Sequence, residues 1–424
     1  QADGAVTVRY GDTIILATAV AGNERDTDFF PLTVDYREKT HAAGKFPGGF
    51  YKREGRPTAK ETLTMRLTDR PLRPLFPKSY RCEVQVMSIV LSADKENNPD
   101  ILAMIGASAA LCISSIPFGG PIASVRVGRV NGEFVLNPTH SELKNSDMDM
   151  VLSGSEDGVL MVEAGAKEVS EDDILHAMVF AEDAVKEIVK LQKELVAICG
   201  KEKQQITEFD VDEGLYKAVW EEAYDRVKEK SITPGKQARD RALSEIQSAL
   251  IEKYCKAEGA VAKEKDINYI FDQIERKVVR EQILNENKRV DGRGLDEIRH
   301  ISCEVGLLPM THGSALFTRG ETQALVVTTL GTAMDEQRVE ALEDEYSKKF
   351  MLHYNFPPFC VGEVKPSFGP SRREIGHGNL AERALEAVMP DHQKFSYTVR
   401  LVSDILESNG SSSMGTVCGG TLCL

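Results

Sequence analysis

The sequence predicts an α+β protein in which one mixed domain is duplicated on either side of a small all-helical domain. Two observations predict this arrangement. Several segments recur in the same order more than 300 residues apart, and a charged stretch with few glycines separates the two copies. We place the first copy at residues 1–200, the helical domain at 201–287 and the second copy at 288–424. A chain of 424 residues is long enough for these domains.

The repeat is clearest where each copy begins. The segment VRYGDTIILATAVAG starts at residue 8, and its counterpart FTRGETQALVVTTLG starts at residue 317. Further along, RLTDRPLRPLFP (66–77) matches NLAERALEAVMP (379–390), and residues 84–111 match residues 397–422. A spacing this long excludes a solenoid of short repeats and indicates a duplicated domain.

Each copy is expected to open with a tight turn that leads into a buried strand. Gly11-Asp12 and Gly320-Glu321 supply the turns, and β-branched runs such as TIILATAV follow them. In the first copy, VQVMSIVLSAD predicts a second strand. The small-residue run ILAMIGASAALCIS predicts a helix that packs closely on the sheet.

The first copy then continues with a hairpin and a long helix. Asn131-Gly132 lies between two strand-like runs and predicts a tight hairpin turn. GVLMVEAGA predicts a further strand, and the helix that follows begins at Ser170 with the pattern of a capping box.

Three stretches of helical periodicity lie between the copies, and residues 231–235 (SITPG) separate the first stretch from the second. All three are rich in charge and nearly free of glycine. For this domain the sequence indicates no more than a spacer packed on one of the copies.

The composition excludes several classes of protein. Lys+Arg number 52 against Asp+Glu 66, a net charge of −14, which argues against a generally basic surface for DNA or anionic lipid. No run approaches 18 apolar residues, so no membrane span is expected. The eight cysteines include no C-x-x-C pair and no zinc spacing, which favours a reduced, cytoplasmic protein.

Residues 50–81 are an exception to the acidic composition, with nine basic residues and three acidic ones. The string PGGFYKREGRP places two aromatic residues beside two cations in a Gly/Pro-rich loop. Aromatic faces stack on bases while cations neutralise phosphates, so the pattern indicates a contact with single-stranded nucleic acid. A solvated charged loop explains the composition equally well, and Arg66, Arg70 and Arg73 could pair with Asp69.

The second copy carries a candidate anion site. Ser411, Ser412 and Ser413 follow Asn-Gly and lead directly into a helical run. Hydroxyls and free N–H groups at a helix start bind anions, and Arg372 and Arg373 could add a fork of donors. The simpler alternative is an N-cap followed by a linker. The first copy has residues 98–101 (Asn-Pro-Asp-Ile) at the same place, where a proline removes a donor and an acid repels phosphate.

These motifs resemble those of a known family. Residues 288–326 resemble the opening of an RNase PH domain, and REIGHG and SNGSSSM resemble the active copy of that family. With FYKREGRP, PLRPLFP and the helical insert, the whole chain resembles the bacterial polynucleotide phosphorylases. In that family two RNase PH-like domains flank a helical domain, and three subunits form a ring whose channel admits single-stranded RNA.

The resemblance implies a phosphorolytic 3′-to-5′ exoribonuclease that acts in mRNA degradation in the cytoplasm. Inorganic phosphate would attack the 3′-terminal phosphodiester of single-stranded RNA and release nucleoside 5′-diphosphates, and the reaction would be reversible. The implied partners are RNA, two further copies of the chain in a homotrimer, and components of an RNA degradosome. No DNA and no membrane are expected.

The resemblance also implies roles for individual residues. The attacking phosphate would be bound by Ser411, Ser412 and Ser413, with Arg372 and Arg373 beside it, and His377 would complete the catalytic group. The RNA would contact Arg319, near its 3′ end, and the channel loop with its basic flank: Phe50, Tyr51, Lys52, Arg53 and Arg56. The family pattern of that loop is Phe-Phe-Arg-Arg, so Tyr51 and Lys52 are departures that preserve an aromatic ring and a cation.

The family's metal ion, Mg²⁺, is held by aspartates in a segment of the second copy that we expect beyond Leu424. The first copy has a counterpart of that segment at residues 145–150, where we expect Asp147 and Asp149 to be structural. We therefore interpret the chain as a fragment. It would lack the extreme N-terminus, the end of the second copy and the family's KH and OB-fold domains, and alone it would aggregate or be inactive.

Two alternatives stay open on the sequence alone. The first is a hydrolytic exoribonuclease on the same scaffold, which would release nucleoside monophosphates in place of diphosphates. The second is a catalytically silent RNA-binding subunit of a ring. The serine loop argues against the second alternative, and the missing aspartates argue for it.

Overall fold

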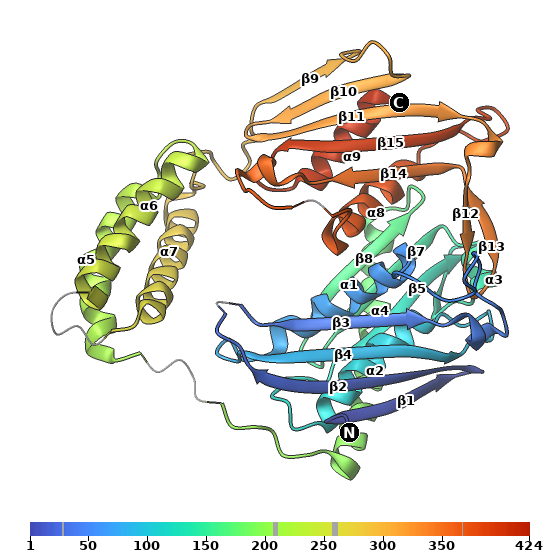
Figure 1. The fold of residues 1–424 in the computed structure, drawn as a ribbon, viewed down its shortest axis with the longest axis horizontal. Helices are drawn as coiled ribbons and strands as arrows, with labels where there is room; N and C mark the ends of the chain where they lie inside the picture. Colours follow the sequence, from blue (N-terminus) through green and yellow to red (C-terminus); the bar gives the residue numbers. More distant parts are fainter. Residues whose placement is uncertain (28, 207–210, 257–261, 367) are drawn as a thin grey trace. The chain divides into compact units, whose positions relative to one another are not determined.

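A computed structural model describes the chain except for residues 28, 207–210, 257–261 and 367. The chain divides into two compact units, one of residues 1–208 with 302–424 and the other of residues 209–301. The first unit holds both copies of the repeat, and the second holds the helices between them (Figure 1). The mixed strands and helices confirm the predicted α+β class.

The first copy begins with a four-stranded sheet of order β1-β2-β4-β3. Its strands are β1 (Gly4–Tyr10), β2 (Thr13–Glu24), β3 (Leu32–Glu38) and β4 (Cys82–Ser92). Strands β3 and β4 are parallel, and helix α1 (Ala59–Leu72) crosses between them. Helix α2 (Pro99–Ile113) packs on β1 and β2. The predicted strands at TIILATAV and VQVMSIVLSAD and the predicted helix at ILAMIGASAALCIS are confirmed.

A second, antiparallel sheet of order β6-β5-β7-β8 completes the first copy. Its strands are β5 (Ala123–Val130), β6 (Glu133–Leu136), β7 (Met148–Gly154) and β8 (Val159–Ala166), with the short helix α3 (His140–Leu143) before β7. Asn131 and Gly132 both have positive φ, 53° and 85°, which confirms the predicted tight hairpin turn. Helix α4 (Glu171–Cys199) buries one apolar stripe against this sheet.

The start of α4 only partly follows the capping-box prediction. The Ser170 hydroxyl accepts a hydrogen bond from the Asp173 N–H, as expected of an N-cap. The Asp173 carboxylate accepts from the Ser170 hydroxyl at 2.7 Å and from Arg129 at 2.6 Å. An ion pair to the sheet therefore takes the place of the reciprocal bond to the Ser170 backbone N–H.

The second copy repeats the first half of the first copy. Its five-stranded sheet has the order β14-β15-β11-β10-β9. The strands are β9 (Ile301–Val305), β10 (Gly313–Arg319), β11 (Thr322–Gly331), β14 (Phe350–Asn355) and β15 (Thr398–Glu407). Helix α8 (Arg372–Glu386) links the parallel pair β14 and β15, and α9 (Ser412–Cys423) packs on β10 and β11. The series β10, β11, β14, α8, β15, α9 thus reproduces β1, β2, β3, α1, β4, α2.

A hairpin of the second copy reaches into the first. It consists of β12 (Gln337–Glu340) and β13 (Glu345–Lys348), and Leu342 at its tip is buried in a core cluster with Tyr36 and Met65 of the first copy. Next to it, the Lys60 ammonium pairs with the Glu343 carboxylate at 2.9 Å. The two copies therefore share a core and an ion pair.

Short helical turns connect the larger elements of the first unit. They are η1 (Thr40–Ala43), η2 (Arg73–Leu75), η4 (Ala333–Asp335) and η5 (Pro358–Val361). None of the described helices has the length and apolar composition that a membrane span requires.

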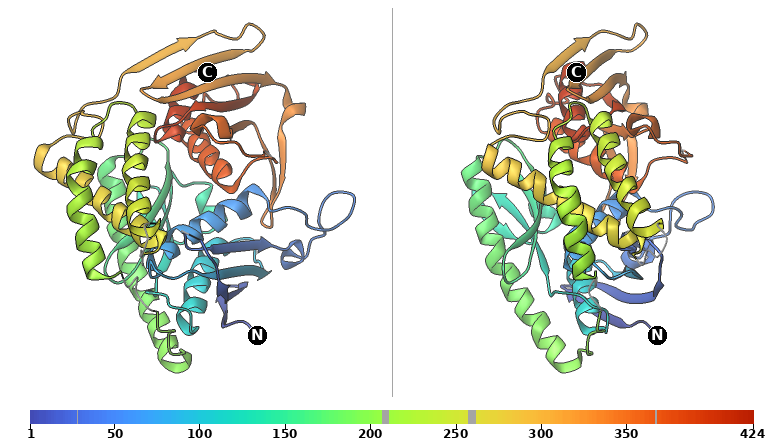
Figure 2. Two further views of the ribbon diagram at one scale, coloured as in Figure 1. Left: turned by 60° about the vertical axis from the view of Figure 1, so that its left-hand side comes forward. Right: turned by 90° about the vertical axis from the view of Figure 1, so that its left-hand side faces the viewer.

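The second unit is a bundle of three helices around its own apolar core. They are α5 (Glu213–Lys230), α6 (Lys236–Ile251), which continues as the π-helical turn η3 (Glu252–Lys256), and α7 (Glu264–Glu286). The helices lie side by side in all the views (Figures 1 and 2). The predicted break between the first two is confirmed, since α6 begins after Gly235, whose φ is 80°.

Candidate active site

The serine loop lies between strand β15 and helix α9. Gly410 and Ser411 both have positive φ, 86° and 44°, and α9 begins at the next residue, Ser412. The left-handed backbone reverses the chain at once, so that the helix starts directly at the end of the sheet. The first turn of α9 therefore presents N–H groups that the helix itself leaves unpaired, together with the positive end of its dipole.

Arg319 holds this loop through its backbone. One terminal nitrogen of Arg319 donates to the carbonyl oxygens of Gly410 and Ser411, at 3.0 and 3.2 Å. The Thr322 hydroxyl donates to the same Gly410 oxygen and accepts from the Asn409 N–H, both within 3.2 Å. The structure gives Arg319 a positioning role at the phosphate loop, and its expected contact with RNA stays a prediction.

The three serines are not equivalent. Ser412 is buried, and its hydroxyl lies 2.6 Å from the hydroxyl of Tyr354, which is also buried. Burial raises the pKa of Tyr354 to about 12, so both hydroxyls are neutral near pH 7. Ser411 is exposed and Ser413 is half-buried. The hydroxyls of Ser411 and Ser413 and the N–H groups of the first turn are therefore the donors that a ligand could reach, while Ser412 bonds the helix start to Tyr354 of the sheet.

The two arginines at the start of α8 point to different partners. Arg372 donates to the Val34 carbonyl oxygen at 2.6 Å and to the Asp35 carboxylate at 2.8 Å, both on β3 of the first copy. Arg373 lies over the ring of Phe356 at 5.6 Å. Arg372 thus bonds the second copy to the first. The guanidinium of Arg373, in contrast, has no hydrogen-bond partner among the described residues. Phosphate binding by either arginine stays a prediction.

His377 lies one turn further along α8, beside the Tyr354 ring at a centroid distance of 5.3 Å. Burial lowers the pKa of His377, and the positive charges of Arg373 and Arg66 lower it further. The imidazole is therefore neutral near pH 7. Its Nδ1 is buried and has no hydrogen-bond partner among the described residues, which is unusual for a buried polar atom.

Arg66 is a site residue whose position the sequence did not reveal. It belongs to α1 of the first copy, yet its Nε lies so close to Gly376 of α8 that a side chain at 376 would collide with it. Burial lowers the pKa of Arg66, and the nearby charges of Arg70 and Arg373 add to this effect. Cations from the two copies thus gather beside His377, an arrangement that an anion would stabilise.

The first copy fills the equivalent position with its own ion pair. Helix α2 begins at Pro99, and the next residue, Asp100, is buried against the guanidinium of Arg126. Arg126 also pairs with Asp149, while Asp147 pairs with Arg129 at 2.7 Å. The start of α2 is therefore occupied by an arginine and carboxylates that neutralise one another. These ion pairs agree with the structural role expected for Asp147 and Asp149.

The aromatic loop of the first copy is open to solvent. Phe50 and Tyr51 are 94% and 89% exposed, with their rings edge to face at 5.6 Å. Lys52, Arg53 and Arg56 are exposed as well and have no ion-pair partner among the described residues. Other basic residues of the 50–81 stretch are engaged, as expected for Arg73, which forms a bidentate pair with Asp69. The loop therefore offers bare rings and free cations, and its RNA contact stays a prediction.

The described residues contain no group of three or more His, Cys, Asp or Glu side chains that could hold a metal ion. Glu374, in the first turn of α8, is used in a capping box with Ser371. The acid set that Mg²⁺ prefers is therefore not found beside the serine loop in this part of the structure.

Comparison with known proteins identifies the fold. The family model described as "3′ exoribonuclease family, domain 1" matches residues 1–117 and again 297–424, which is more than half of the chain. The chain belongs to the 3′ exoribonuclease family. The model for domain 2 of this family matches residues 120–184. A model described as "Polyribonucleotide nucleotidyltransferase, RNA binding domain" matches residues 214–294.

Curated relatives within the 3′ exoribonuclease family are similar over the whole chain. Polyribonucleotide nucleotidyltransferases of Desulfosudis oleivorans and Geobacter sulfurreducens are 52% and 54% identical and cover 100% of this chain. That of Chloroflexus aurantiacus is 52% identical with the same coverage. The resemblance predicted from the sequence is confirmed. The chain spans 59%, 61% and 57% of the length of these three relatives, respectively.

Proposed function

We propose that this protein is a phosphorolytic 3′-to-5′ exoribonuclease that converts single-stranded RNA and inorganic phosphate into nucleoside 5′-diphosphates, reversibly. Membership of the 3′ exoribonuclease family and the names of the relatives support the reaction class. The curated relatives carry the name of a nucleotidyltransferase, and a reversible transfer of nucleotidyl groups to phosphate fits that name.

One observation carries the proposal within the structure, namely the difference between two equivalent helix starts. In the first copy, Asp100 and Arg126 close the start of α2 with a buried ion pair. In the second copy, the first turn of α9 contains no acidic residue, and the side chains of Ser411 and Ser413 remain at least partly exposed. A helix start of this kind suits a phosphate dianion, which the dipole and the hydroxyl both stabilise.

The side chains around the serine loop have distinct parts in this scheme. Ser413 and the first N–H groups of α9 hold the attacking phosphate, and Arg319 and Ser412 keep the loop in shape. Arg373 and Arg66 neutralise charge that builds up on the phosphates, and neutral His377 accepts or donates a hydrogen bond at the RNA end. An oxygen of the phosphate then attacks the terminal phosphorus in line, and the 3′ oxygen of the preceding nucleotide leaves.

We also propose that Mg²⁺ assists the reaction by neutralising the phosphoryl oxygens when it is bound. Its carboxylate ligands would lie outside the described residues, because those residues include no suitable group. No step above depends on the ion.

The assembly and setting are part of the same proposal. Three copies would form a ring with the loop of Phe50 and Tyr51 at the channel, where RNA enters. The protein would act in mRNA degradation in the cytoplasm, alone or with degradosome components.

The test is the identity of the product. Poly(A) is incubated with the natural full-length protein, phosphate and Mg²⁺, and the nucleotides are separated by chromatography. Phosphate-dependent ADP supports the proposal, and AMP released without phosphate supports the hydrolytic alternative. Absence of both products while RNA is still bound would favour the silent RNA-binding subunit. The 424-residue chain is assayed in parallel, and we expect it to release no ADP.

A further inference from the structure

The helical unit carries an aromatic stripe that its sequence alone did not suggest. Tyr216, Trp220 and Tyr224 follow each other at intervals of four residues and so lie on one face of α5. Their rings are stacked, with centroids 5.4 Å apart for the first pair and 6.0 Å for the second. The stripe is half-buried, so part of each ring remains accessible.

Basic side chains of α7 face this stripe across a groove of about 370 Å³. Arg276, Lys277 and Arg280 line it, and one carboxylate, Glu281, lies among them. Arg276 and Arg280 are exposed and form no ion pair or hydrogen bond with the described residues. Glu281 is already engaged, because it accepts a hydrogen bond from Tyr224 and lies 3.8 Å from Lys277. The groove therefore offers a net positive charge beside aromatic surface.

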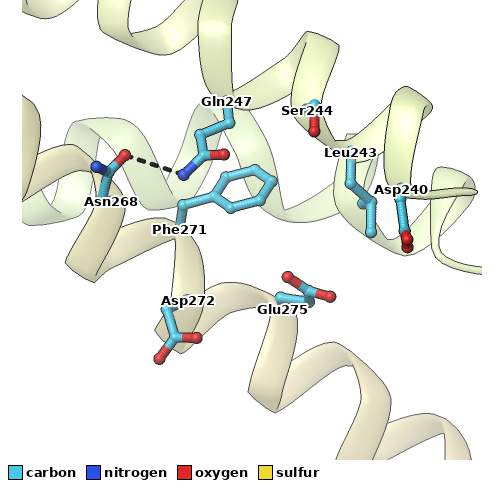
Figure 3. A pocket seen from close by; sticks show the side chains of 8 residues that line it. All are labelled: Asp240, Leu243, Ser244, Gln247, Asn268, Phe271, Asp272 and Glu275. Atoms are coloured by element: carbon cyan, nitrogen blue, oxygen red, sulfur yellow. Dashed lines mark hydrogen bonds between the residues drawn. The ribbon is translucent and has the colours of Figure 1, made fainter. Parts of the chain in front are cut away.

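The opposite side of α7 has the reverse character. A groove of about 240 Å³ between α6 and α7 is lined by the acidic residues Asp240, Asp272 and Glu275. Figure 3 shows two of these acids along α7 and, further along the groove, the hydrogen bond of 2.9 Å between Gln247 and Asn268. Burial raises the pKa of Glu275, and the charges of Asp272 and Asp240 raise it further. This acidic groove repels a polyanion. The helical unit therefore has an acidic groove on one side of α7 and a basic groove on the other.

We infer that the groove between α5 and α7 binds single-stranded RNA, with a base stacked on Trp220 and phosphates on Arg276 and Arg280. The family model matched by this region names an RNA-binding domain but gives no surface. The charge and the stripe favour RNA over an apolar partner, because cations and stacked rings together suit a nucleic acid strand. The inference rests on RNA being the substrate, as proposed above.

Lys277 would take part in binding by changing its partner. In the free protein its ammonium lies over the Trp220 ring, 5.3 Å from the ring centroid. An exposed cation–π contact is weaker than the stacking of a base on an aromatic ring. A base can therefore displace the ammonium from the ring, and the ammonium then has a phosphate within reach.

Trp220 makes this site directly observable, because it is the one tryptophan in the sequence. We propose titrating the chain with fluorescein-labelled single-stranded oligoadenylate, following the anisotropy of the label and, in a parallel unlabelled titration, the emission of Trp220. A stacked base should quench the indole with the same midpoint as the anisotropy change. Added salt should weaken both signals together.

Matched variants identify the surface. Arg276→Ala/Arg280→Ala should weaken the quenching at least tenfold in RNA concentration. Arg239→Ala/Arg241→Ala removes two cations from α6 outside the groove. This variant should change the RNA concentration at half-maximal quenching by less than twofold relative to the wild type. Inorganic polyphosphate, which has charge but no bases, should compete without quenching.

Three results would overturn the inference: saturated anisotropy without quenching, equal effects of the two double variants, or equal quenching by polyphosphate. The first would place the RNA elsewhere, for example on the loop of Phe50 and Tyr51. The last would mean a general polyanion surface. ADP release is measured separately, so loss of the proposed reaction with quenching intact would reject the proposed function and leave this inference standing.

Discussion

The neighbouring serines at the start of α9 differ in what they contact, although the sequence presents them as one triplet. Ser412 uses its hydroxyl on Tyr354 inside the protein, whereas Ser413 is free to meet a ligand. The same distinction separates Arg372, which is bonded to the first copy, from Arg373. Residues with the same chemistry thus divide into those that build the site and those that can act in it.

This difference predicts different defects for the two serines. In the full-length protein, Ser413→Ala should raise the KM for phosphate about tenfold or more, since a hydrogen bond to a charged group contributes roughly 1.5–3 kcal/mol. Its Tm should stay close to that of the wild type. Ser412→Ala leaves the buried Tyr354 hydroxyl without its partner and should lower the free energy of unfolding by about 1–3 kcal/mol.

Phosphate kinetics and urea unfolding measured on both variants check this. Tyr354→Phe combined with Ser412→Ala is the control, because removal of both hydroxyls should cost less stability than the sum of the single changes. Unchanged phosphate dependence in Ser413→Ala would remove this residue from the proposed site.

Asp94 is a residue on which pH should act. Its carboxylate accepts hydrogen bonds from the backbone N–H groups of Asp12, Glu96 and Asn97. Partial burial raises the pKa of Asp94, but the hydrogen bonds from Asn97, Glu96 and Asp12 together outweigh it and hold the pKa well below its ordinary value. A lowered pKa means that the folded state favours the ionised form, so its stabilisation is complete above the ordinary pKa and is lost as pH falls through the lowered one.

We therefore expect Asp94→Asn to lower stability by the same amount at pH 7 and pH 5, and by less at pH 3. Urea midpoints at the three values measure the difference between wild type and variant. Asp157→Asn, in the exposed turn between β7 and β8, is the charge-matched control. A difference that grows toward low pH would contradict the assignment.

At the scale of elements, the loop between η1 and α1 exposes aromatic rings, together with cations that have no ion-pair partner among the described residues. Its base is closed by two bonds, because the Thr40 N–H donates to the Glu54 carboxylate and Arg37 donates to the Gly55 carbonyl oxygen. Just before this closed base, Phe50, Tyr51, Lys52 and Arg53 are exposed. An anchored loop with a bare tip suits contact with a flexible strand, since its own ordering cost is already met by the fold.

Lys52→Ala/Arg53→Ala should weaken binding of long single-stranded RNA and reduce the slope of log affinity against log salt by about 0.7 for each phosphate that the loop no longer neutralises. Cleavage of very short oligonucleotides should be nearly unaffected, because they need not reach this loop. Lys186→Ala/Lys190→Ala on α4 removes the same charge from another element and serves as the control. An equal defect with short and long RNA would place the loop in the catalytic centre.

At the scale of the whole first unit, the two copies behave as one folded body. The β12–β13 hairpin buries Leu342 in the first copy, and Glu163 of β8 pairs with Arg70 of α1 and with Arg383 of α8. Arg66 and Arg372 cross the same boundary near the site. The first copy therefore supplies part of the surroundings of the serine loop in the second copy.

Leu342→Ala should lower the free energy of unfolding by about 2–5 kcal/mol, the usual effect of truncating a buried leucine. Tyr346→Ala changes an exposed residue of the same hairpin and should alter the free energy of unfolding by less than about 0.5 kcal/mol. Urea unfolding of both variants measures this. Similar small effects would mean that the hairpin adds nothing to the joint core.

The sequence by itself determined the class of fold, the duplication, the long strands and helices and the place of the serine loop. Local patterns predict these features, such as the β-branched run of β2 and the Asn131-Gly132 pair, whose positive φ the structure confirms. The duplication follows from motifs that recur along the chain. The family followed from the same motifs.

Only the tertiary structure decided which of the marked residues face a ligand. Arg372 is bonded to Asp35 and Arg66 lies against Gly376, contacts that join positions about 300 residues apart. The Tyr216–Trp220–Tyr224 stripe became a candidate site only when α7 brought its cations opposite the rings. Periodicity reports the environment of a residue along its own element, whereas the partner of a side chain depends on how distant elements pack, and the local sequence does not encode that packing.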